Sequence, residues 1–224
     1  MRPQRRRGKK VYCAGPLFNE AEKVEMEAIA NGLEAASYRT FLPQRDGLEL
    51  ATVAETIMKR SGLDRNSVTS ILSRAIFSLD VYQVADCEGL VLNMNGRVPD
   101  EGAMVEAGIA WAHNKKIVIF KNDARTLMNG TDNPLVLGLS NFVTAQSQDD
   151  IVAQFDRLFG EELEHSETPE LRIPAFQVMK DKGKKIWAHL QNGAEPEVLC
   201  DLLISLFAGN PKANEQSSRT RHAV

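Results

Sequence analysis

The sequence has few of the residues that metal-binding, disulfide-rich and membrane proteins need. It contains only three cysteines and four histidines among 224 residues, and neither set has the spacing of a metal site. An odd number of scattered cysteines predicts reduced thiols and a cytoplasmic location rather than a disulfide framework. No apolar run is long enough to cross a bilayer or to form the core of a signal peptide. We therefore expect no metal, no membrane partner and no disulfide.

Two common phosphate-binding motifs are also absent. No glycine-rich dinucleotide fingerprint follows the first predicted strand, and no loop carries the lysine and hydroxyl pair of an ATP-binding motif. We therefore expect no bound nicotinamide or ATP and no other cofactor. A net charge of -3 gives the whole chain no attraction to a nucleic acid polymer. The exception is the basic tail at residues 1–9, which we expect to be disordered.

What the sequence does contain is typical of a globular protein, with 43% hydrophobic and 25% charged residues. Apolar runs predict strands, and helical periodicity fills most of the segments between them. This alternation predicts an α/β fold with a mostly parallel sheet and right-handed crossovers. The expected strands are 10–16, 38–42, 89–95, 116–121 and 141–144, and the expected helices between and after them are 20–36, 48–60, 67–84, the helix from 102 and 148–159.

Composition divides the chain further. An α/β domain is expected over residues 10–160, followed by an acidic and polar linker over 161–174. Helical periodicity returns over 175–209 and predicts a helical appendage, and the last segment, 210–224, is expected to be a disordered tail.

The stretch Pro99–Trp111 holds the most unusual residue of the chain. From Gly102 it has the pattern of a helix that is apolar nearly all round, and such a helix is expected to be buried. Glu106 lies within it, and a buried carboxylate is costly unless it is paired or protonated. One interpretation makes Asp100 a helix cap and lets Glu106 face a cleft or a subunit contact. The other makes Glu106 a nucleophile or an acid/base group, with a second acid nearby.

Loops after the first three predicted strands point to one ligand pocket, because parallel sheets bind ligands beyond the carboxyl ends of their strands. After the first strand, Gly15 lets the backbone approach a ligand without a side chain in the way. The helices before and after the third strand bring further acids toward the same edge. The candidate carboxylate cluster is Asp80, Asp100 and Glu106.

These motifs resemble the nucleoside 2-deoxyribosyltransferase family over roughly residues 10–160. The most specific match is the spacing of both acids and the glycines in the stretch around Glu106. The matching segments are Val11–Asn19, Pro43–Asp46, Asp86–Glu88 with the strand after it, and Pro99–Gly108.

The resemblance implies a flavodoxin-like (Rossmann-like) three-layer sandwich with five strands, and it implies an enzyme of nucleotide salvage. It makes Glu106 the nucleophile that attacks the anomeric carbon of a 2-deoxyribose, expels the base and forms a deoxyribosyl-enzyme ester. It also makes Asp100 the acid that handles the proton of the base, Asp80 a further active-site acid, and Tyr12 the donor that orients the nucleophile.

The same resemblance implies a substrate pocket for nucleosides and free bases. Gly15 and Phe18 belong to its substrate loop, with Phe18 stacking on the base, and Gln44 or Asp46 supplies polar contacts. Asn133 corresponds to a residue that a neighbouring subunit lends, which predicts a homo-oligomer.

Two other functions stay open. One is a hydrolase that cleaves 2'-deoxynucleoside 5'-monophosphates, which needs a phosphate pocket to which Arg97 could contribute. The other is a non-catalytic nucleotide-binding module. Several single residues also have plainer interpretations, in which Tyr12 is an ordinary strand residue, Phe18 is core, Asp46 forms a turn and Asp80 is solvated.

Overall fold

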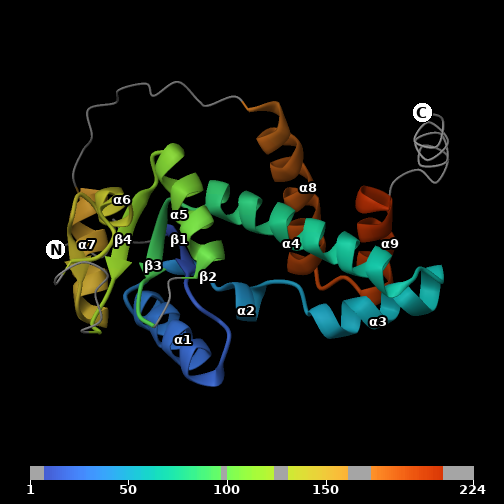
Figure 1. The fold of residues 1–224 in the computed structure, drawn as a ribbon, viewed down its shortest axis with the longest axis horizontal. Helices are drawn as coiled ribbons and strands as arrows, with labels where there is room; N and C mark the ends of the chain where they lie inside the picture. The colour runs from blue at the N-terminus through green and yellow to red at the C-terminus, as the bar shows by residue number, and fades with distance from the viewer. Residues whose placement is uncertain (1–7, 97–99, 124–130, 161–172, 209–224) are drawn as a thin grey trace, which may run out of the picture. The chain divides into compact units, whose positions relative to one another are not determined.

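The structure, a computed structural model, describes residues 8–96, 100–123, 131–160 and 173–208. The chain divides into two compact units. An α/β unit comprises residues 1–47 and 83–173, and a helical unit comprises residues 48–82 and 174–224. Figure 1 shows the elements of both along the chain.

The α/β unit is built on a five-stranded, wholly parallel sheet with the order β2-β1-β3-β4-β5. This is the flavodoxin-like strand order, in which ligands bind at the carboxyl edge beside β1 and β3. The predicted fold class is confirmed. The strands are β1 (Lys10–Ala14), β2 (Arg39–Phe41), β3 (Gly89–Asn93), β4 (Lys116–Phe120) and β5 (Thr144–Ala145).

Helices cover both faces of this sheet and make three layers. The helices α1 (Glu20–Ala35) and α7 (Gln148–Gly160) pack on one face, and α5 (Glu101–Ala112) packs on the other (Figure 1). Side chains alternate across β1, so Val11 and Cys13 enter the core shared with α1 and α7 while Tyr12 points to the other face. Short segments complete the unit: α2 (Pro43–Asp46), α6 (Pro134–Leu137) and the 3-10 helix η2 (Gly138–Ser140).

Local chemistry explains where α1 begins. Asn19 is its N-cap, accepting a hydrogen bond from the backbone N–H of Glu22, whose own side chain accepts from the backbone N–H of Asn19. This reciprocal capping box satisfies two N–H groups that a helix start leaves without partners. The capping box fixes the first turn of α1 next to the loop that follows β1.

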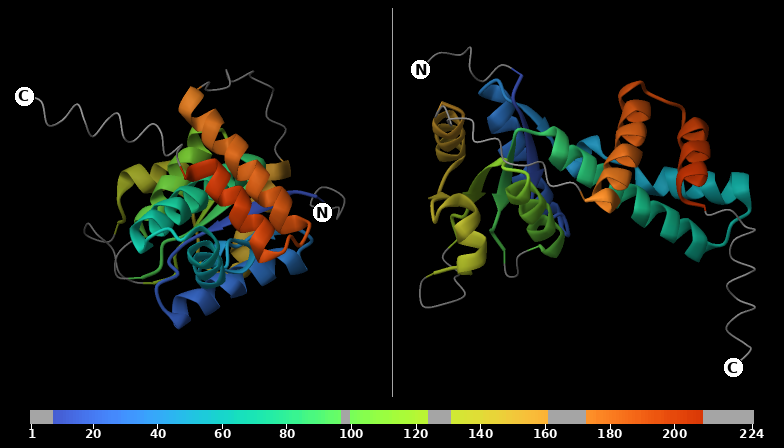
Figure 2. Two further views of the ribbon diagram at one scale, coloured as in Figure 1. Left: turned by 90° about the vertical axis from the view of Figure 1, so that its right-hand side faces the viewer. Right: turned by 90° about the horizontal axis from the view of Figure 1, so that it is seen from above.

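The helical unit gathers two segments that are far apart in the sequence. Figure 2 shows α8 and α9, in orange and red, side by side. Arg60 forms an ion pair with Asp201 across 2.9 Å, and α3 packs on α9. Gly183 lies so close to α4 that an added Cβ would be 1.9 Å from the carbonyl oxygen of Ser78. The helices are α3 (Leu50–Ser61), α4 (Arg65–Asp86, ending in the α/β unit), α8 (Pro174–Gln191) and α9 (Pro196–Phe207).

This grouping differs from the division expected from composition, which placed residues 48–82 in the α/β domain and gave only 175–209 to the appendage. Helical periodicity found the helices, but it carries no information on which helices pack together. The expected linker and the two tails fall almost wholly outside the described residues, and Arg97 lies outside them as well. Within the part of the chain that the structure describes, no helix is long and apolar enough to cross a membrane.

Two local expectations were wrong. The stretch Pro43–Asp46, expected to be a polar loop, forms the short helix α2, because proline suits a first helical turn. The helix α5, expected to be buried all round, buries one face only. Val105 is 57% exposed and Trp111 is 62% exposed on the other face, so the apolar pattern of this helix overstated its burial.

Candidate active site

A tyrosine and a glutamate meet at the face of the sheet that α5 covers. The hydroxyl of Tyr12 donates a hydrogen bond to Oε1 of Glu106 across 2.6 Å. Tyr12 is fully buried in β1, and its ring stacks on Phe41 of β2 with the ring centroids 5.5 Å apart. Glu106 is half-buried. A hydrogen bond to an ionised acceptor is short and roughly twice as strong as a neutral one, so this contact orients the carboxylate.

The helix that carries Glu106 begins at Asp100. The Asp100 side chain is the N-cap of α5, and its Oδ1 accepts a 2.6 Å hydrogen bond from the backbone N–H of Ala103. The structure therefore gives Asp100 the helix-cap position that one interpretation of the sequence assigned to it. The small residues Ala103, Ala107 and Ala110 form the buried face of the helix, so α5 approaches the sheet closely and carries Glu106 toward Tyr12.

The loop after β1 exposes an aromatic ring. The Phe18 side chain is 74% exposed, so the interpretation of Phe18 as a core residue is wrong. Packing requires a glycine at position 15, because an added Cβ would lie 2.5 Å from Sδ of Met26 and 2.8 Å from Cβ of Asn93. The chain leaves β1 through a gap that only glycine fits, and it then presents Phe18 to solvent.

The two polar residues expected from α2 have different surroundings. Asp46 is tied to its own turn, since Oδ2 accepts a 2.8 Å hydrogen bond from the backbone N–H of Leu42 and Oδ1 pairs with Arg45 at 3.0 Å. Gln44 donates from Nε2 to the carbonyl oxygen of Lys23 at 2.9 Å. Its Oε1 is buried and has no hydrogen-bond partner within the described residues.

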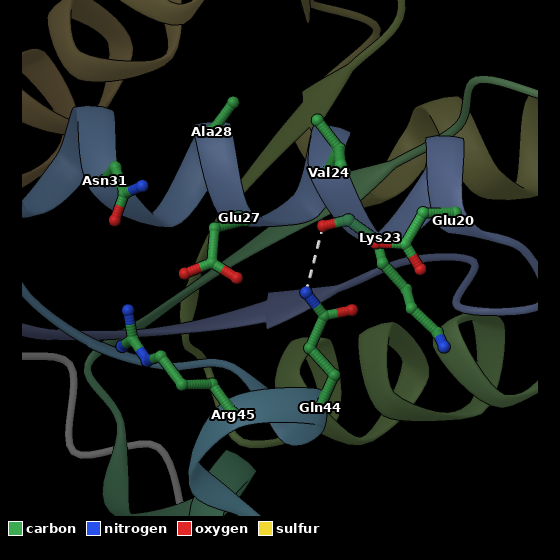
Figure 3. A pocket seen from close by; sticks show the side chains of 8 residues that line it. All are labelled: Glu20, Lys23, Val24, Glu27, Ala28, Asn31, Gln44 and Arg45. Atoms are coloured by element: carbon green, nitrogen blue, oxygen red, sulfur yellow. Dashed lines mark hydrogen bonds between the residues drawn. The ribbon is translucent and has the colours of Figure 1, made fainter.

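Gln44 also lines a hollow of about 560 Å³ between α1 and α2 (Figure 3). Its lining is mostly the outward side of α1, with both signs of charge. Neither Tyr12 nor Glu106 lines this hollow, so it is a feature distinct from their contact. The lining residues are Glu20, Lys23, Val24, Glu27, Ala28, Asn31, Gln44 and Arg45.

Comparison with known proteins assigns the chain to a family. A family model described as nucleoside 2-deoxyribosyltransferase matches residues 11–170, more than half of the chain. The chain belongs to this family. A comparison with curated proteins finds no match.

Among solved structures, the chain is similar to a conserved protein from Enterococcus faecalis V583, at 18% identity and a TM-score of 0.48 over 67% of this chain and 98% of that one. A 2-deoxyribosyltransferase from Bacillus psychrosaccharolyticus matches at 16% identity and a TM-score of 0.45, over 64% and 90% of the two chains. A CMP N-glycosidase from Clostridium botulinum matches at 16% identity and a TM-score of 0.38, over 66% and 99%. The names of these similar structures thus include a transferase and an N-glycosidase.

Two other residues to which the family resemblance gave a role, Asp80 and Asn133, lie on other elements than Tyr12 and Glu106. Asp80 is half-buried on α4, within the helical unit, so its expected convergence with Glu106 stays a prediction. Asn133 is the N-cap of α6, and its Oδ1 accepts a 2.9 Å hydrogen bond from the backbone N–H of Leu135. The contribution of Asn133 to a neighbouring subunit also stays a prediction.

The cysteines near the sheet are not activated nucleophiles. Burial raises the pKa of the Cys87 thiol to about 12, with Asp86 adding to the rise and Lys10 opposing it. Burial likewise raises the pKa of the Cys13 thiol. Both thiols are therefore neutral at ordinary pH, and the reactive anion is scarce. Within the described residues, no group of His, Cys, Asp and Glu side chains is arranged to hold a metal ion.

A buried polar residue at the end of β3 was missed by the sequence reasoning. Asn93 is the last residue of β3, and only 1% of it is exposed. The sequence did hold a signal for it, because Asn93 is a polar residue that interrupts the apolar run from Gly89 to Met94. Its amide forms hydrogen bonds with α1 and with the loop after β3.

Proposed function

We propose that this protein is a nucleoside 2-deoxyribosyltransferase that exchanges the base of 2'-deoxyribonucleosides. The observation that carries the proposal is the 2.6 Å hydrogen bond from the Tyr12 hydroxyl to Glu106, at the position where the family motif has its nucleophile. A carboxylate held in one orientation at the carboxyl edge of the sheet suits attack on the anomeric carbon of a bound sugar.

The proposed reaction has two displacements at one carbon. In the first, a carboxylate oxygen of Glu106 bonds to C1' while the bond from C1' to the base nitrogen breaks, and its electron pair leaves with the base. Asp100 gives a proton to the departing base. In the second, a nitrogen of the incoming base bonds to C1', the ester bond to Glu106 breaks, and Asp100 takes back a proton. Two inversions give net retention, as in retaining glycosidases.

The remaining residues are proposed to hold and orient the substrate. Phe18 is exposed beside the first turn of α1 and is proposed to stack on the base, while Gly15 leaves room for the loop. Gln44 is the proposed polar contact, because its buried Oε1 lacks a partner among the described residues. Asp46 is proposed to hold α2 in shape for Gln44.

Asp80 and Asn133 complete the proposed site. Asp80 is proposed as a further acid beside the sugar. Asn133 is proposed to reach a neighbouring copy in a homo-oligomer. We further propose a cytoplasmic enzyme of nucleotide salvage that uses small-molecule nucleosides and bases, without a cofactor.

Hydrolysis of 2'-deoxynucleoside 5'-monophosphates is the runner-up. In it water, rather than a base, opens the ester, and the substrate carries a 5'-phosphate that needs a pocket of its own. Incubating a 2'-deoxynucleoside and, separately, its 5'-monophosphate, each with and without an acceptor base, separates the two. The proposal predicts a new nucleoside when the acceptor is present. Free deoxyribose or its phosphate, formed equally with and without acceptor, would favour the hydrolase, and binding without turnover would favour a non-catalytic module.

The role of Glu106 is tested by Glu106→Gln, which keeps the shape of the side chain but removes the nucleophilic charge. We expect the exchange rate to fall about a thousandfold or more. Glu101→Gln is the matched control, because Glu101 is an exposed acid in the first turn of the same helix. If Glu106→Gln exchanges bases as fast as the control, the proposed function is wrong.

A further inference from the structure

A buried amide at the end of β3 touches the starts of two loops of the proposed site. Asn93 lies on the sheet face that α1 covers, where Nδ2 donates to Oε2 of Glu25 at 2.8 Å and approaches Sδ of Met26 at 3.5 Å. Its Oδ1 accepts a 2.9 Å hydrogen bond from the backbone N–H of Asn95. An amide side chain offers a donor and an acceptor together, and Asn93 uses both.

The loop after β1 rests on the same residue. A Cβ on Gly15 would lie 2.8 Å from Cβ of Asn93, so the chain that leads to Phe18 packs directly against it. On the other side, Asn95 starts the chain that leads to Asp100. The amide of Asn95 donates to Oε1 of Glu25 at 2.8 Å, and Glu25 therefore uses one oxygen for each asparagine.

The loop after β4 fastens the start of this chain as well. Nδ2 of Asn95 donates to Oδ1 of Asn122 at 2.7 Å, and the backbone N–H of Asn122 donates back to Asn95 at 3.0 Å. The backbone N–H of Gly96, whose φ of +115° suits glycine, donates to Asp123 at 2.9 Å. Every polar atom of the Asn93 side chain has a partner in this arrangement, so its orientation is set.

We propose that Asn93, oriented by Glu25, is a positioning residue for the reaction proposed above. It does not reach the substrate. Its amide fixes the chain that leaves β1 toward Phe18 and the first residues after β3, up to Gly96, and it thereby sets the starts of both loops relative to the sheet that carries Tyr12. The inference rests on the proposed function for its effect on rate, but the fixing of the two loops is a property of the folded chain alone.

An exchange of the two partners tests this inference. Asn93→Asp places two carboxylates at hydrogen-bond distance, and Glu25→Gln brings a second donor to one of the two asparagine amides that Glu25 accepts from. In the double variant Glu25→Gln/Asn93→Asp, the amide nitrogen at position 25 donates to the carboxylate at position 93. The amide oxygen at position 25 accepts from Asn95 as Glu25 does, and the net charge does not change. We expect each single variant to lower kcat/KM of base exchange about tenfold to a hundredfold, because small displacements of reacting groups have effects of that size. The double variant should return to within about threefold of the unmodified protein.

The pH dependence supplies a readout that general loss of stability does not give. In Asn93→Asp, a proton shared with Glu25 restores a donor, so activity relative to the unmodified protein should rise as pH falls. Charged groups of the neighbouring segment, Lys121, Asp123 and Asp132, are present in both proteins and cancel in this ratio. Gln154→Glu is the matched control, since Gln154 is a buried amide that donates to Asp150 at 3.4 Å on α7. It should lose stability and keep the pH profile of the unmodified protein.

Hydrogen exchange of the loop amides separates this inference from the proposed function. Without substrate, protection around Gly15 and Asn95 should fall in both single variants and return in the double variant. If protection stays unchanged in the singles, or if the double variant is no better than the singles in protection and rate, the positioning role is wrong. If protection follows the expected pattern while the unmodified protein exchanges no bases, the positioning of the loops stands and the proposed function fails. Should Asn93→Asp not fold, comparing Glu25→Gln with the double variant decides in the same way.

Discussion

At the scale of single residues, the contact between Tyr12 and Glu106 carries the functional account. The family resemblance named both residues, and the fold brings them to 2.6 Å from positions 94 residues apart. Sequence spacing could not supply this distance, because it depends on how closely α5 packs on β1. The small residues on the buried face of α5 are what allow that approach.

Replacing Tyr12 with phenylalanine removes the donor and keeps the ring stack with Phe41. We expect kcat to fall about tenfold to a hundredfold, which corresponds to the typical 1.5–3 kcal/mol of a hydrogen bond to a charged group. Tyr38→Phe is a matched control, because the Tyr38 hydroxyl donates to Asp156 at 2.8 Å in the same unit. Steady-state kinetics should show the loss in the first variant and not in the second. Equal rates in the two variants would contradict an orienting role for Tyr12.

The buried thiol of Cys87 should make the free energy of unfolding fall as pH rises through the alkaline range. Burial raises its pKa to about 12, whereas an unfolded thiol titrates near ~8.5. The thiol therefore binds its proton more tightly in the folded state than in the unfolded state. The stability that this difference contributes is complete below the unfolded pKa and is lost as pH rises through about 9 to 12. Urea unfolding between pH ~8 and ~10 should show a falling free energy of unfolding. The fall should be shallower in Cys87→Ala, and an identical slope in both proteins would contradict this account.

At the scale of secondary structure elements, the sequence predicted the regular parts well and the irregular parts poorly. The apolar runs of β1, β3 and β4 are local signals, and the structure has these strands at nearly the predicted residues. The helix α2 was missed because four residues give no periodicity. Burial of α5 was overestimated because an apolar sequence does not reveal which face meets a partner.

The short helix α2 depends on Asp46, whose carboxylate accepts from the backbone N–H of Leu42 and pairs with Arg45. We expect Asp46→Ala to lower the free energy of unfolding by about 1–2 kcal/mol, as the loss of a helix-end acceptor typically does. Asp46→Asn keeps an acceptor and loses only the partly exposed ion pair, so it should cost less than about 1 kcal/mol. Urea denaturation measures both. An equal loss in the two variants would show that the ion pair, not the capping bond, holds this turn.

At the scale of the whole molecule, the division into two units lay beyond sequence reasoning. Residues 48–82 and 174–224 form one unit, although more than ninety residues of the α/β unit separate them in the sequence. The pairing of α3 with α9, and the contact of Gly183 with Ser78, join segments about a hundred or more residues apart. Composition and periodicity register only neighbours along the chain, so they could find these helices without finding the unit.

Gly183→Val tests whether these segments share one cooperative unit. The added side chain would overlap the carbonyl oxygen of Ser78, and overpacking of this kind typically destabilises by about 1–3 kcal/mol or more. Hydrogen exchange measured by mass spectrometry should show lost protection in α3 and α9 as well as in α8. The strands β1, β3 and β4 should keep their protection. Loss confined to α8 would contradict a single helical unit.

The central claim is that Glu106 bonds covalently to the sugar during base exchange. The most direct test is to quench the protein during turnover of a 2'-deoxyribonucleoside, digest it, and locate the modified peptide by mass spectrometry. We predict one deoxyribosyl group on the peptide that contains Glu106, lost when an acceptor base is added before the quench and never formed in Glu106→Gln. Base exchange with the sugar attached to a different residue, or undiminished exchange in Glu106→Gln, would contradict the account.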